Sequence, residues 1–139
     1  MIVLDTNVLS AVMRATPEAA VVRWLDNQPE DSIWITSITA LEVRFGIQLL
    51  PRGRKRAALS QAFDSFLESI RNRIAAFDYD AAEHAAALMA RRKQVGRPVE
   101  LRDTMIAGIV LARHATLATR NTAHSQDTGI ALVDPWRET

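Results

Sequence analysis

Short aliphatic runs alternate along this chain with longer segments of helical periodicity. Five runs have the length and the residue types of buried strands, and they cover residues 2–4, 33–36, 74–77, 115–119 and 130–133. Strands that alternate with helices in this way predict a mostly parallel sheet with helices packed on both of its faces. We therefore expect an α/β fold in three layers, with a central sheet of about five strands.

The segments between the strands carry different helix patterns. Apolar residues of segment 59–70 recur at i, i+3, i+4, i+7, i+8 and i+11, which is the stripe of a helix that buries one face. Pro17 suits the first turn of a helix over residues 17–25, and Asp80 is expected to cap an alanine-rich helix over residues 80–94. The nearly all-apolar segment 103–112 predicts a central helix that its neighbours cover.

The composition narrows the class of protein. The 139 residues include 48% hydrophobic side chains, so we expect a single domain over residues 1–139 with a substantial core. Seventeen basic and 16 acidic residues give a net charge of +1, which makes no overall electrostatic case for nucleic acid. The absence of cysteine excludes disulfides and zinc–thiolate sites. No apolar stretch is long enough to cross a bilayer, so we expect a soluble, cytoplasmic protein with no membrane partner.

Three acidic residues stand at junctions where a strand or a loop gives way to a helix. Asp5 ends the first aliphatic run, Glu42 follows the second run within two helical turns, and Asp103 opens the all-apolar helix. Each has an ordinary structural explanation. Asp5 is a good helix cap, Thr39-x-x-Glu42 matches a capping box, and the helix dipole favours an acid such as Asp103 in a first turn. Taken singly, none of the three indicates a function.

Their joint position on a parallel sheet is more informative. Open α/β sheets bind their ligands beyond the carboxyl ends of the strands, and we expect Asp5, Glu42 and Asp103 to converge at that edge. Two carboxylates about 4 Å apart repel by roughly 1 kcal/mol in water and roughly 4 kcal/mol at an effective dielectric constant near 20. A divalent cation would reverse this cost, and ligands that are all oxygen favour Mg²⁺ or Mn²⁺. Such a site suits the hydrolysis of a phosphodiester.

At these residues the chain resembles the PIN-domain family, and within it the VapC and FitB type toxins of bacterial type II toxin–antitoxin systems. The resemblance runs over the whole length and is carried by Leu4-Asp5-Thr6-Asn7, Ser37-x-Thr39-x-x-Glu42, Asp103-x-x-Ile106-Ala107, Ala118-Thr119-Arg120-Asn121 and Val133-Asp134-Pro135-Trp136. It implies a compact α/β/α fold and an endoribonuclease that depends on Mg²⁺ or Mn²⁺. It also implies a homodimer held inactive by a cognate antitoxin, with any contact to DNA made by the antitoxin.

The resemblance also assigns roles to single residues. Asp5, Glu42 and Asp103 take the first three acidic positions of the family and would be the catalytic and metal-binding residues. Four polar residues would line the same cleft and orient the acids or the water on the metal: Thr6, Asn7, Thr119 and Asn121.

The fourth acidic position departs from the family pattern. After Thr119-Arg120-Asn121 the family commonly continues with two variable residues and an Asp, whereas this chain has His124. His124 could bind the metal or its water through a ring nitrogen. Alternatively, Asp127 could supply the carboxylate through a shifted loop, or His124 could be a plain loop residue beside a weakened second metal position. The sequence leaves these alternatives open, together with the number of metal ions.

Basic residues form two groups that invite an RNA-binding interpretation. The group near Asp103 is the better candidate for guiding an RNA backbone, with helix-dipole compensation as its alternative: Arg91, Arg92, Lys93, Arg97 and Arg102. The group beside Pro51 and Gly53 is either a phosphate-contacting edge or a solvated helix start: Arg52, Arg54, Lys55 and Arg56. The setting of Trp24, Trp34 and Trp136 among aliphatic residues favours core packing over base stacking. Trp24 or the early helices are candidates for an apolar dimer interface.

Two other functions compete with the nuclease. A phosphohydrolase could use Asp5 as a covalent nucleophile, but such enzymes usually need a second Asp two residues later, where this chain has Asn7. A degenerate PIN domain could bind RNA or an antitoxin without cleaving, and His124 in place of the fourth acid is the feature that supports it. The sequence does not specify which RNA would be cut.

Overall fold

β1 (Ile2–Leu4) lies at the centre of a five-stranded parallel sheet in the computed structural model, which describes residues 1–137. The strand order is β3-β2-β1-β4-β5, and the other strands are β2 (Ile33–Thr36), β3 (Ile74–Ala75), β4 (Thr116–Ala118) and β5 (Ala131–Val133). This sheet confirms the expected fold class. The last two residues of the domain predicted over residues 1–139 lie outside the described part.

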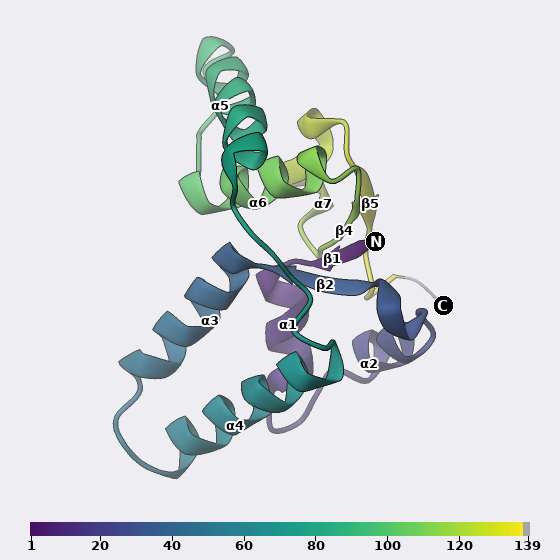
Figure 1. Ribbon diagram of the computed structural model, residues 1–139, viewed down its shortest axis with the longest axis vertical. Coiled ribbons are helices and arrows are strands. Elements are labelled where there is room, and N and C mark those ends of the chain that lie inside the picture. Colours follow the sequence, from purple (N-terminus) through teal and green to yellow (C-terminus); the bar gives the residue numbers. More distant parts are fainter. Residues whose placement is uncertain (138–139) are drawn as a thin grey trace.

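Helices cover both faces of the sheet, and Figure 1 shows α5 and α6 on one side of the strands with α1, α2 and α4 on the other. The seven α-helices of the described residues are α1 (Thr6–Met13), α2 (Ala19–Asp26), α3 (Ser37–Leu49), α4 (Arg54–Ser69), α5 (Tyr79–Gln94), α6 (Leu101–Ala112) and α7 (Thr122–Ser125). Two short 3-10 turns cover Glu30–Ser32 and Gln126–Thr128. No helix within residues 1–137 combines the length and the apolar character that a bilayer crossing requires.

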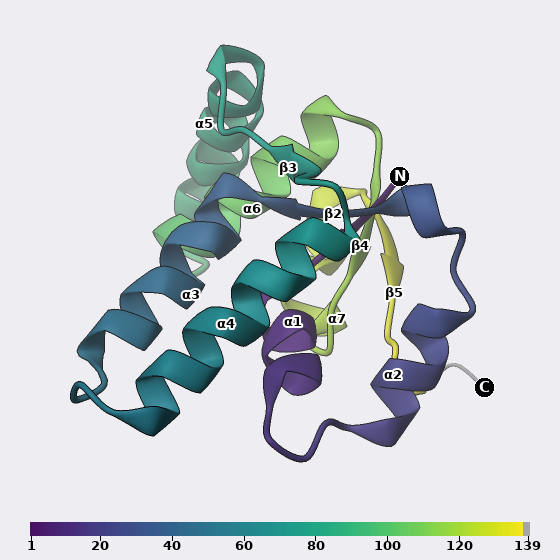
Figure 2. The same cartoon turned by 60° about the horizontal axis from the view of Figure 1, so that its bottom comes forward.

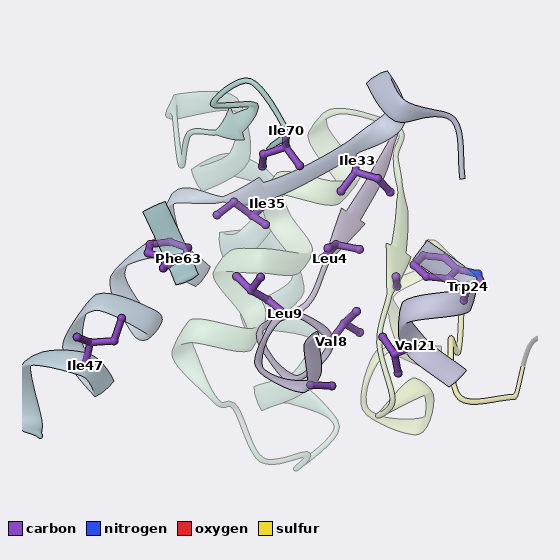
Figure 3. Packing of buried hydrophobic residues seen from close by; sticks show 12 residues of the cluster. Leu4, Val8, Leu9, Val21, Trp24, Ile33, Ile35, Ile47, Phe63 and Ile70 are labelled. Carbon is purple, nitrogen blue, oxygen red and sulfur yellow. The ribbon is translucent and has the colours of Figure 1, made fainter. Parts of the chain in front are cut away.

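Adjacent residues of β1 belong to opposite faces of the sheet, because successive side chains of a strand alternate. Leu4 is fully buried in a cluster with Ile35 of β2 and Phe63 of α4 (Figure 3). Val3 packs on the other face, against residues of α6 such as Ile109. Fully burying a side chain of this size contributes about 1.5–3 kcal/mol. The central strand is therefore fixed from both sides, and with it the position at which β1 ends.

α6 packs very closely on α5 at Gly108. A Cβ atom on Gly108 would lie 2.6 Å from the carbonyl oxygen of Ala81 and 2.8 Å from the Cβ of Ala85. Only glycine allows this approach of the two helices. α6 is buried over most of its length from Thr104 to Val110, as the all-apolar pattern predicts. The packing on α5 thus holds the helix that carries Asp103.

Three local predictions are corrected by the structure. β3 ends at Ala75 and not at residue 77, because the N–H of Phe77 donates to the hydroxyl of Ser37 at 3.1 Å, outside the sheet. Asp78 caps α5 in place of Asp80, and its carboxylate accepts a hydrogen bond from the backbone of the first turn. Trp24 is only 8% exposed in the core, so it is not available for a dimer interface.

The order of the strands creates a switch point between β1 and β4. The chain passes from β1 to β2 and β3 on one side of the sheet, and then returns to β4 and β5 on the other side. The crevice beyond the carboxyl ends of the strands at such a point is the usual ligand site of open α/β sheets. Asp5 follows β1 directly, and its N–H donates to the carbonyl of Ala118, the last residue of β4, at 2.9 Å. The fold therefore places Asp5 in that crevice.

Candidate active site

The carboxylate of Asp5 is fixed by two hydrogen bonds where β1 ends. Its Oδ1 accepts from the N–H of Thr6 at 2.8 Å, which makes Asp5 the cap of α1. Its Oδ2 accepts from the hydroxyl of Thr119, the residue after β4, also at 2.8 Å. The capping role expected from the sequence is therefore real, and it leaves Asp5 with a defined orientation at the switch point.

Glu42 projects from the second turn of α3 toward α1. Its Oε1 accepts a hydrogen bond from the hydroxyl of Thr6 at 2.9 Å, and its Oε2 lies 3.8 Å from Nη1 of Arg102. The prediction that Thr39-x-x-Glu42 forms a capping box is wrong. α3 begins at Ser37, and its cap is Thr36, whose hydroxyl accepts from the N–H of Thr39 at 3.0 Å. Glu42 therefore takes no part in starting α3.

Asp103 lies in the first turn of α6. The cap of this helix is Glu100, whose Oε2 accepts a hydrogen bond from the N–H of Asp103 at 2.7 Å. Within residues 1–137, no protein donor forms a hydrogen bond to the carboxylate of Asp103 itself. Its two oxygen atoms are therefore available to a ligand.

These acids line a single cavity of about 810 Å³. The structure thus brings together Asp5, Glu42 and Asp103, whose positions lie on three different elements. The remainder of the lining is rich in groups that donate hydrogen bonds, and it includes Thr6, Asn7, Ser10, Arg92, Arg97, Asn121, His124 and Ser125. A cavity with acids and hydrogen-bond donors can hold a cation and an anionic group at the same time.

Burial raises the pKa values of Asp5 and Asp103, and repulsion from neighbouring acids raises that of Asp103 further. Burial raises the pKa of Asp5, and the hydrogen bond from Thr119 offsets part of this effect. The pKa of Asp103 is raised first by burial and then by the negative charges of Asp5, Glu100 and Glu42. Both aspartates are harder to ionise than a free carboxyl group, and a nearby cation would favour their charged forms.

The donor set fits a hard divalent cation that keeps much of its water. Every acidic ligand candidate offers oxygen, which is the donor that Mg²⁺ and Mn²⁺ favour. As the side chains stand in residues 1–137, no group of three or more His, Asp or Glu residues is arranged to hold an ion by itself. Mg²⁺ is commonly bound through one or two carboxylates and waters. Asp5 and Asp103 line the same cavity and offer that number of carboxylates.

The polar residues expected around the acids form a network between α1 and the end of β4. Nδ2 of Asn7 donates to the hydroxyl oxygen of Thr119 at 3.4 Å, and Oδ1 of Asn7 accepts from the N–H of Arg120 at 3.3 Å. The N–H of Asn121 also donates to the Thr119 hydroxyl oxygen, at 3.1 Å, and Asn121 lines the cavity. The Thr119 hydroxyl therefore links Asp5 to the side chain of Asn7 and to the backbone of Asn121.

His124 lines the same cavity from α7, a short helix that the sequence patterns do not indicate. A positive charge on its ring would lower the pKa values of both Asp5 and Asp103, so the ring lies within electrostatic range of the two acids. Its position agrees with its place in the motif, where the family has an acid.

Asp127 does not replace the missing acid. Its carboxylate accepts two hydrogen bonds from the guanidinium of Arg92, at 2.9 and 3.0 Å, and Nη1 of Arg97 lies 3.5 Å from it. The hydrogen bonds from Arg92 hold the pKa of Asp127 below its usual value. Asp127 is also absent from the residues that line the cavity. The shifted-loop alternative is therefore wrong, because a structural ion pair occupies this carboxylate.

The prediction that Arg92 contacts RNA is also wrong, because its guanidinium is engaged in the ion pair with Asp127. Its side chain is 7% exposed, and its guanidinium also donates to the hydroxyl of Thr104 at 3.1 Å and to the carbonyl of His124 at 2.9 Å. It holds the segment with His124 and Asp127 against α5 and α6. An arginine with four of its five N–H donors committed in this way has a structural role.

The other four RNA-contact candidates lie on the surface in different settings. Arg97 lines the cavity, and Arg102 lies between Glu42 and Glu100, with Nε 3.7 Å from the latter. Arg91 and Lys93 are exposed on the last turn of α5 and do not line the cavity. Only Arg97 and Arg102 therefore stand where they could meet a substrate held at the acids.

Glu100 is the main site residue that the sequence patterns leave unassigned. It lines the cavity, caps α6 and contributes to the raised pKa of Asp103. The available signal is its place three residues before Asp103, just after Pro98, where an acid is a common helix cap.

A family model described as "PIN domain" matches residues 2–127 of the chain. VapC ribonuclease Y4jK of Sinorhizobium fredii is 35% identical over 137 residues, which cover 98% of each protein. Toxin FitB of Neisseria gonorrhoeae is 33% identical over 139 residues, which cover 99% of this chain and 100% of the relative. A solved structure of FitAB bound to an IR36 DNA fragment has a TM-score of 0.90 at 33% identity and covers 100% of this chain and 98% of the other.

Proposed function

Because the chain belongs to the PIN-domain family and resembles VapC and FitB toxins over its full length, we propose that it is the toxin of a type II toxin–antitoxin pair. Its activity would be that of an endoribonuclease that depends on Mg²⁺ or Mn²⁺. The observation that supports this activity best is the gathering of Asp5, Glu42 and Asp103 in one cavity at the switch point.

Asp5 and Asp103 would hold the cation, and Glu42 would support it through water. The cation would supply the Lewis acidity for phosphodiester hydrolysis and neutralise the charge of the phosphate. Thr119 and Thr6 orient Asp5 by their hydrogen bonds, and Thr6 ties Glu42 to the same site. Because Asp5 and Glu42 are already oriented by these hydrogen bonds, they need little reorganisation when the substrate binds.

The donor groups of the cavity would position the RNA. Arg97, Asn121 and His124 line the cavity together with the acids, so they can hydrogen-bond to a phosphate held there. Arg102, which is about half exposed, can exchange its contact with Glu42 for a contact with the substrate. In this arrangement the carboxylates face the cation and the basic groups face the RNA backbone.

The partner would be a cognate antitoxin, and DNA would be contacted through that antitoxin. The relative FitB is named a toxin, and a structure of FitAB has been solved on DNA. A homodimer in the cytoplasm is the expected state of the free toxin. An antitoxin could inhibit by placing a basic side chain against the acids of the cavity.

A second candidate function is that of a degenerate PIN domain that binds RNA or the antitoxin without cleaving. The specific observation in its favour is that His124 reaches the cavity in place of the fourth acid, and Asp127 does not compensate. With one carboxylate fewer, the site would hold a second cation more weakly.

Cleavage of total RNA tests the proposal. The unaltered protein should cleave in Mg²⁺ or Mn²⁺ and lose this activity in EDTA, and His124→Asp should increase the activity if the fourth position is weakened. Binding of RNA without cleavage under all metal conditions would contradict the nuclease and favour the degenerate domain. A higher activity of His124→Asp together with a low activity of the parent would identify His124 as the cause of the weakness.

A further inference from the structure

The turn between α3 and α4 carries a basic surface that the proposed chemistry does not use. We define the hairpin tip as Arg44, Arg52, Arg54, Lys55 and Arg56. Residues 43–63 contain these five of the chain's 17 basic residues and no Asp or Glu. A protein with a net charge of only +1 has thus gathered positive charge at one end of a helical hairpin. Figure 2 shows α3 and α4 side by side, with the turn far from α2 and the C-terminal end.

Most of this charge is not paired within the protein. Arg52, Arg54 and Lys55 are exposed, and none of them forms a salt bridge with a described residue. Arg56 makes only a long hydrogen bond, 3.5 Å, to the carbonyl of Leu50. Arg44 is the exception, since it pairs with Asp64. The tip therefore presents cations that are free to bind an anion.

Helix stability does not explain the cluster. Arg54, Lys55 and Arg56 form the first turn of α4, a helix of 16 residues, and the N-terminal end of a helix dipole is positive. Cations are unfavourable there, and Gly53 at the cap position provides no side-chain acceptor to offset them. A basic run that only served solubility would be less costly on any other turn of α4. An anion bound at the tip would remove this repulsion.

Part of the tip is recessed between the two helices. A cavity of about 460 Å³ is lined by Arg44, Arg52 and Arg56, with the hydrogen-bonding groups of Gln48 and Ser60 beside them. Arg44 is held in place at this cavity by Asp64 and by the ring of Phe63, whose centre lies 4.6 Å from the guanidinium carbon. The donors thus surround a space that can accept a phosphate group.

α3 connects this surface directly to the acidic cavity. Glu42 lies near the start of α3, and Arg52 of the tip follows the end of this helix, which is about 10 Å further along the axis at 1.5 Å per residue. Phe45 lies between them and is 56% exposed, so its ring is available to stack on a base. A few nucleotides of single-stranded RNA can span this distance.

We propose that the hairpin tip binds the phosphate backbone of the RNA strand whose scissile phosphate occupies the acidic cavity. This inference rests on the proposed ribonuclease function. Acids in the cavity repel a polyanion until a cation binds, so cations outside the cavity would add to the affinity for RNA. RNA is favoured over an acidic protein segment because the donors of the tip surround a recess that can accept a phosphate group.

The test measures RNA binding separately from cleavage. A labelled single-stranded RNA is titrated by fluorescence anisotropy in EDTA over a range of salt concentrations, with Asp103→Asn in every protein to prevent cleavage. Arg52→Ala/Arg54→Ala removes two charges from the tip. Arg23→Ala/Arg137→Ala removes two exposed charges, one on α2 and one after β5, and gives the same net charge. Arg52→Lys/Arg54→Lys retains the tip charge.

For single strands, each phosphate contact contributes about 0.7 to the slope of log K against log salt concentration. The tip double variant should bind more weakly and lose about 0.7–1.4 of this slope. The control pair and the lysine pair should keep the parental slope. Equal slopes in the tip double variant and the parent, or an equal loss in the control pair, would overturn the proposal. A tip variant that keeps RNA binding and loses only the binding of an antitoxin would also overturn the proposal. If the parent itself does not bind RNA, the proposed function fails together with this inference.

Discussion

The hydroxyl of Thr119 donates a hydrogen bond to Oδ2 of Asp5 at 2.8 Å, which joins the ends of the two strands on either side of the switch point. The two residues are 114 positions apart in the sequence. Thr119 is only 1% exposed, and its oxygen also accepts from the N–H of Asn121. The orientation of the first acid therefore depends on a residue at the far end of the chain.

Replacement of Thr119 by Val should weaken the site without emptying the space that Thr119 fills. The change removes a hydrogen bond to a carboxylate and should reduce the free energy of unfolding by about 1.5–3 kcal/mol. It should also raise the pKa of Asp5 further, because the Thr119 hydroxyl lowers that pKa in the parent. The acidic limb of the pH–cleavage profile should then move to higher pH. An unchanged profile in Thr119→Val would show that this hydrogen bond does not control the ionisation of Asp5.

Stability without divalent ions should increase as the pH falls below neutral. Burial raises the folded-state pKa values of Asp5 and Asp103 above their unfolded values, so their ionised forms cost stability at high pH. This cost disappears as the pH falls through the raised folded values. Asp127 has the opposite effect, because Arg92 lowers its pKa in the folded protein and its ionised form stabilises the fold. This stabilisation is lost as the pH falls through the lowered pKa of Asp127. Urea unfolding in EDTA across this range provides the measurement. Asp5→Asn/Asp103→Asn should lack the increase, and a double variant with the parental profile would refute the assignment.

Arg92 and Arg97 both lie beside the carboxylate of Asp127, so replacing each of them in turn tests which one matters for stability. Arg92→Ala should destabilise the protein by about 1–3 kcal/mol, because it removes a buried guanidinium and leaves the partly exposed carboxylate of Asp127 without its two hydrogen bonds. Arg97 lies 3.5 Å from the same carboxylate but is 36% exposed, so Arg97→Ala should cost about 0–1 kcal/mol. Denaturant unfolding of the two variants gives both numbers. Similar losses in the two would mean that Arg92 is not the residue that fixes the His124 segment.

Replacement by alanine should change the stability of the protein in opposite directions at two helical glycines, Gly108 and Gly46. Gly108→Ala forces a Cβ atom to within 2.6 Å of the Ala81 carbonyl oxygen, and it should destabilise the protein by about 1–3 kcal/mol. Gly46 in α3 has no atom within 4 Å of a Cβ position, so Gly46→Ala should stabilise by about 0.4–1 kcal/mol. Melting temperatures are sufficient to test the signs. Stabilisation by Gly108→Ala would show that α5 and α6 can separate at little cost.

The regular parts of the fold could be predicted because their patterns are local. β1 and β2 have the predicted bounds, and the apolar segment from residue 103 forms α6 within the core. Glu42 shows where local patterns fail. Its spacing from Thr39 fits a capping box, but the helix starts at a better-placed cap, Thr36, and the acid pairs with Thr6 from another helix. Only the tertiary fold decides between two such caps.

The buried position of Arg92 could not be predicted for a related reason. In the sequence it stands between Arg91 and Lys93 at the basic end of a helix, where all three suit the dipole. Its burial depends on the ion pair with Asp127, which lies 35 residues further on. The sequence alone suggests Asp127 as a possible metal ligand. A charged pair that forms across the fold leaves no periodic signal in either segment.

The most direct test of the central claim is cleavage of RNA in Mg²⁺ by Asp103→Asn, with Asp31→Asn as a control of equal charge outside the cavity. Asp103→Asn keeps the shape of the side chain and removes the negative charge that faces the ligand. We predict that Asp103→Asn loses cleavage while it keeps its circular dichroism spectrum, and that Asp31→Asn cleaves like the parent. Parental cleavage by a folded Asp103→Asn protein would contradict the assignment of this cavity as a metal-dependent ribonuclease site.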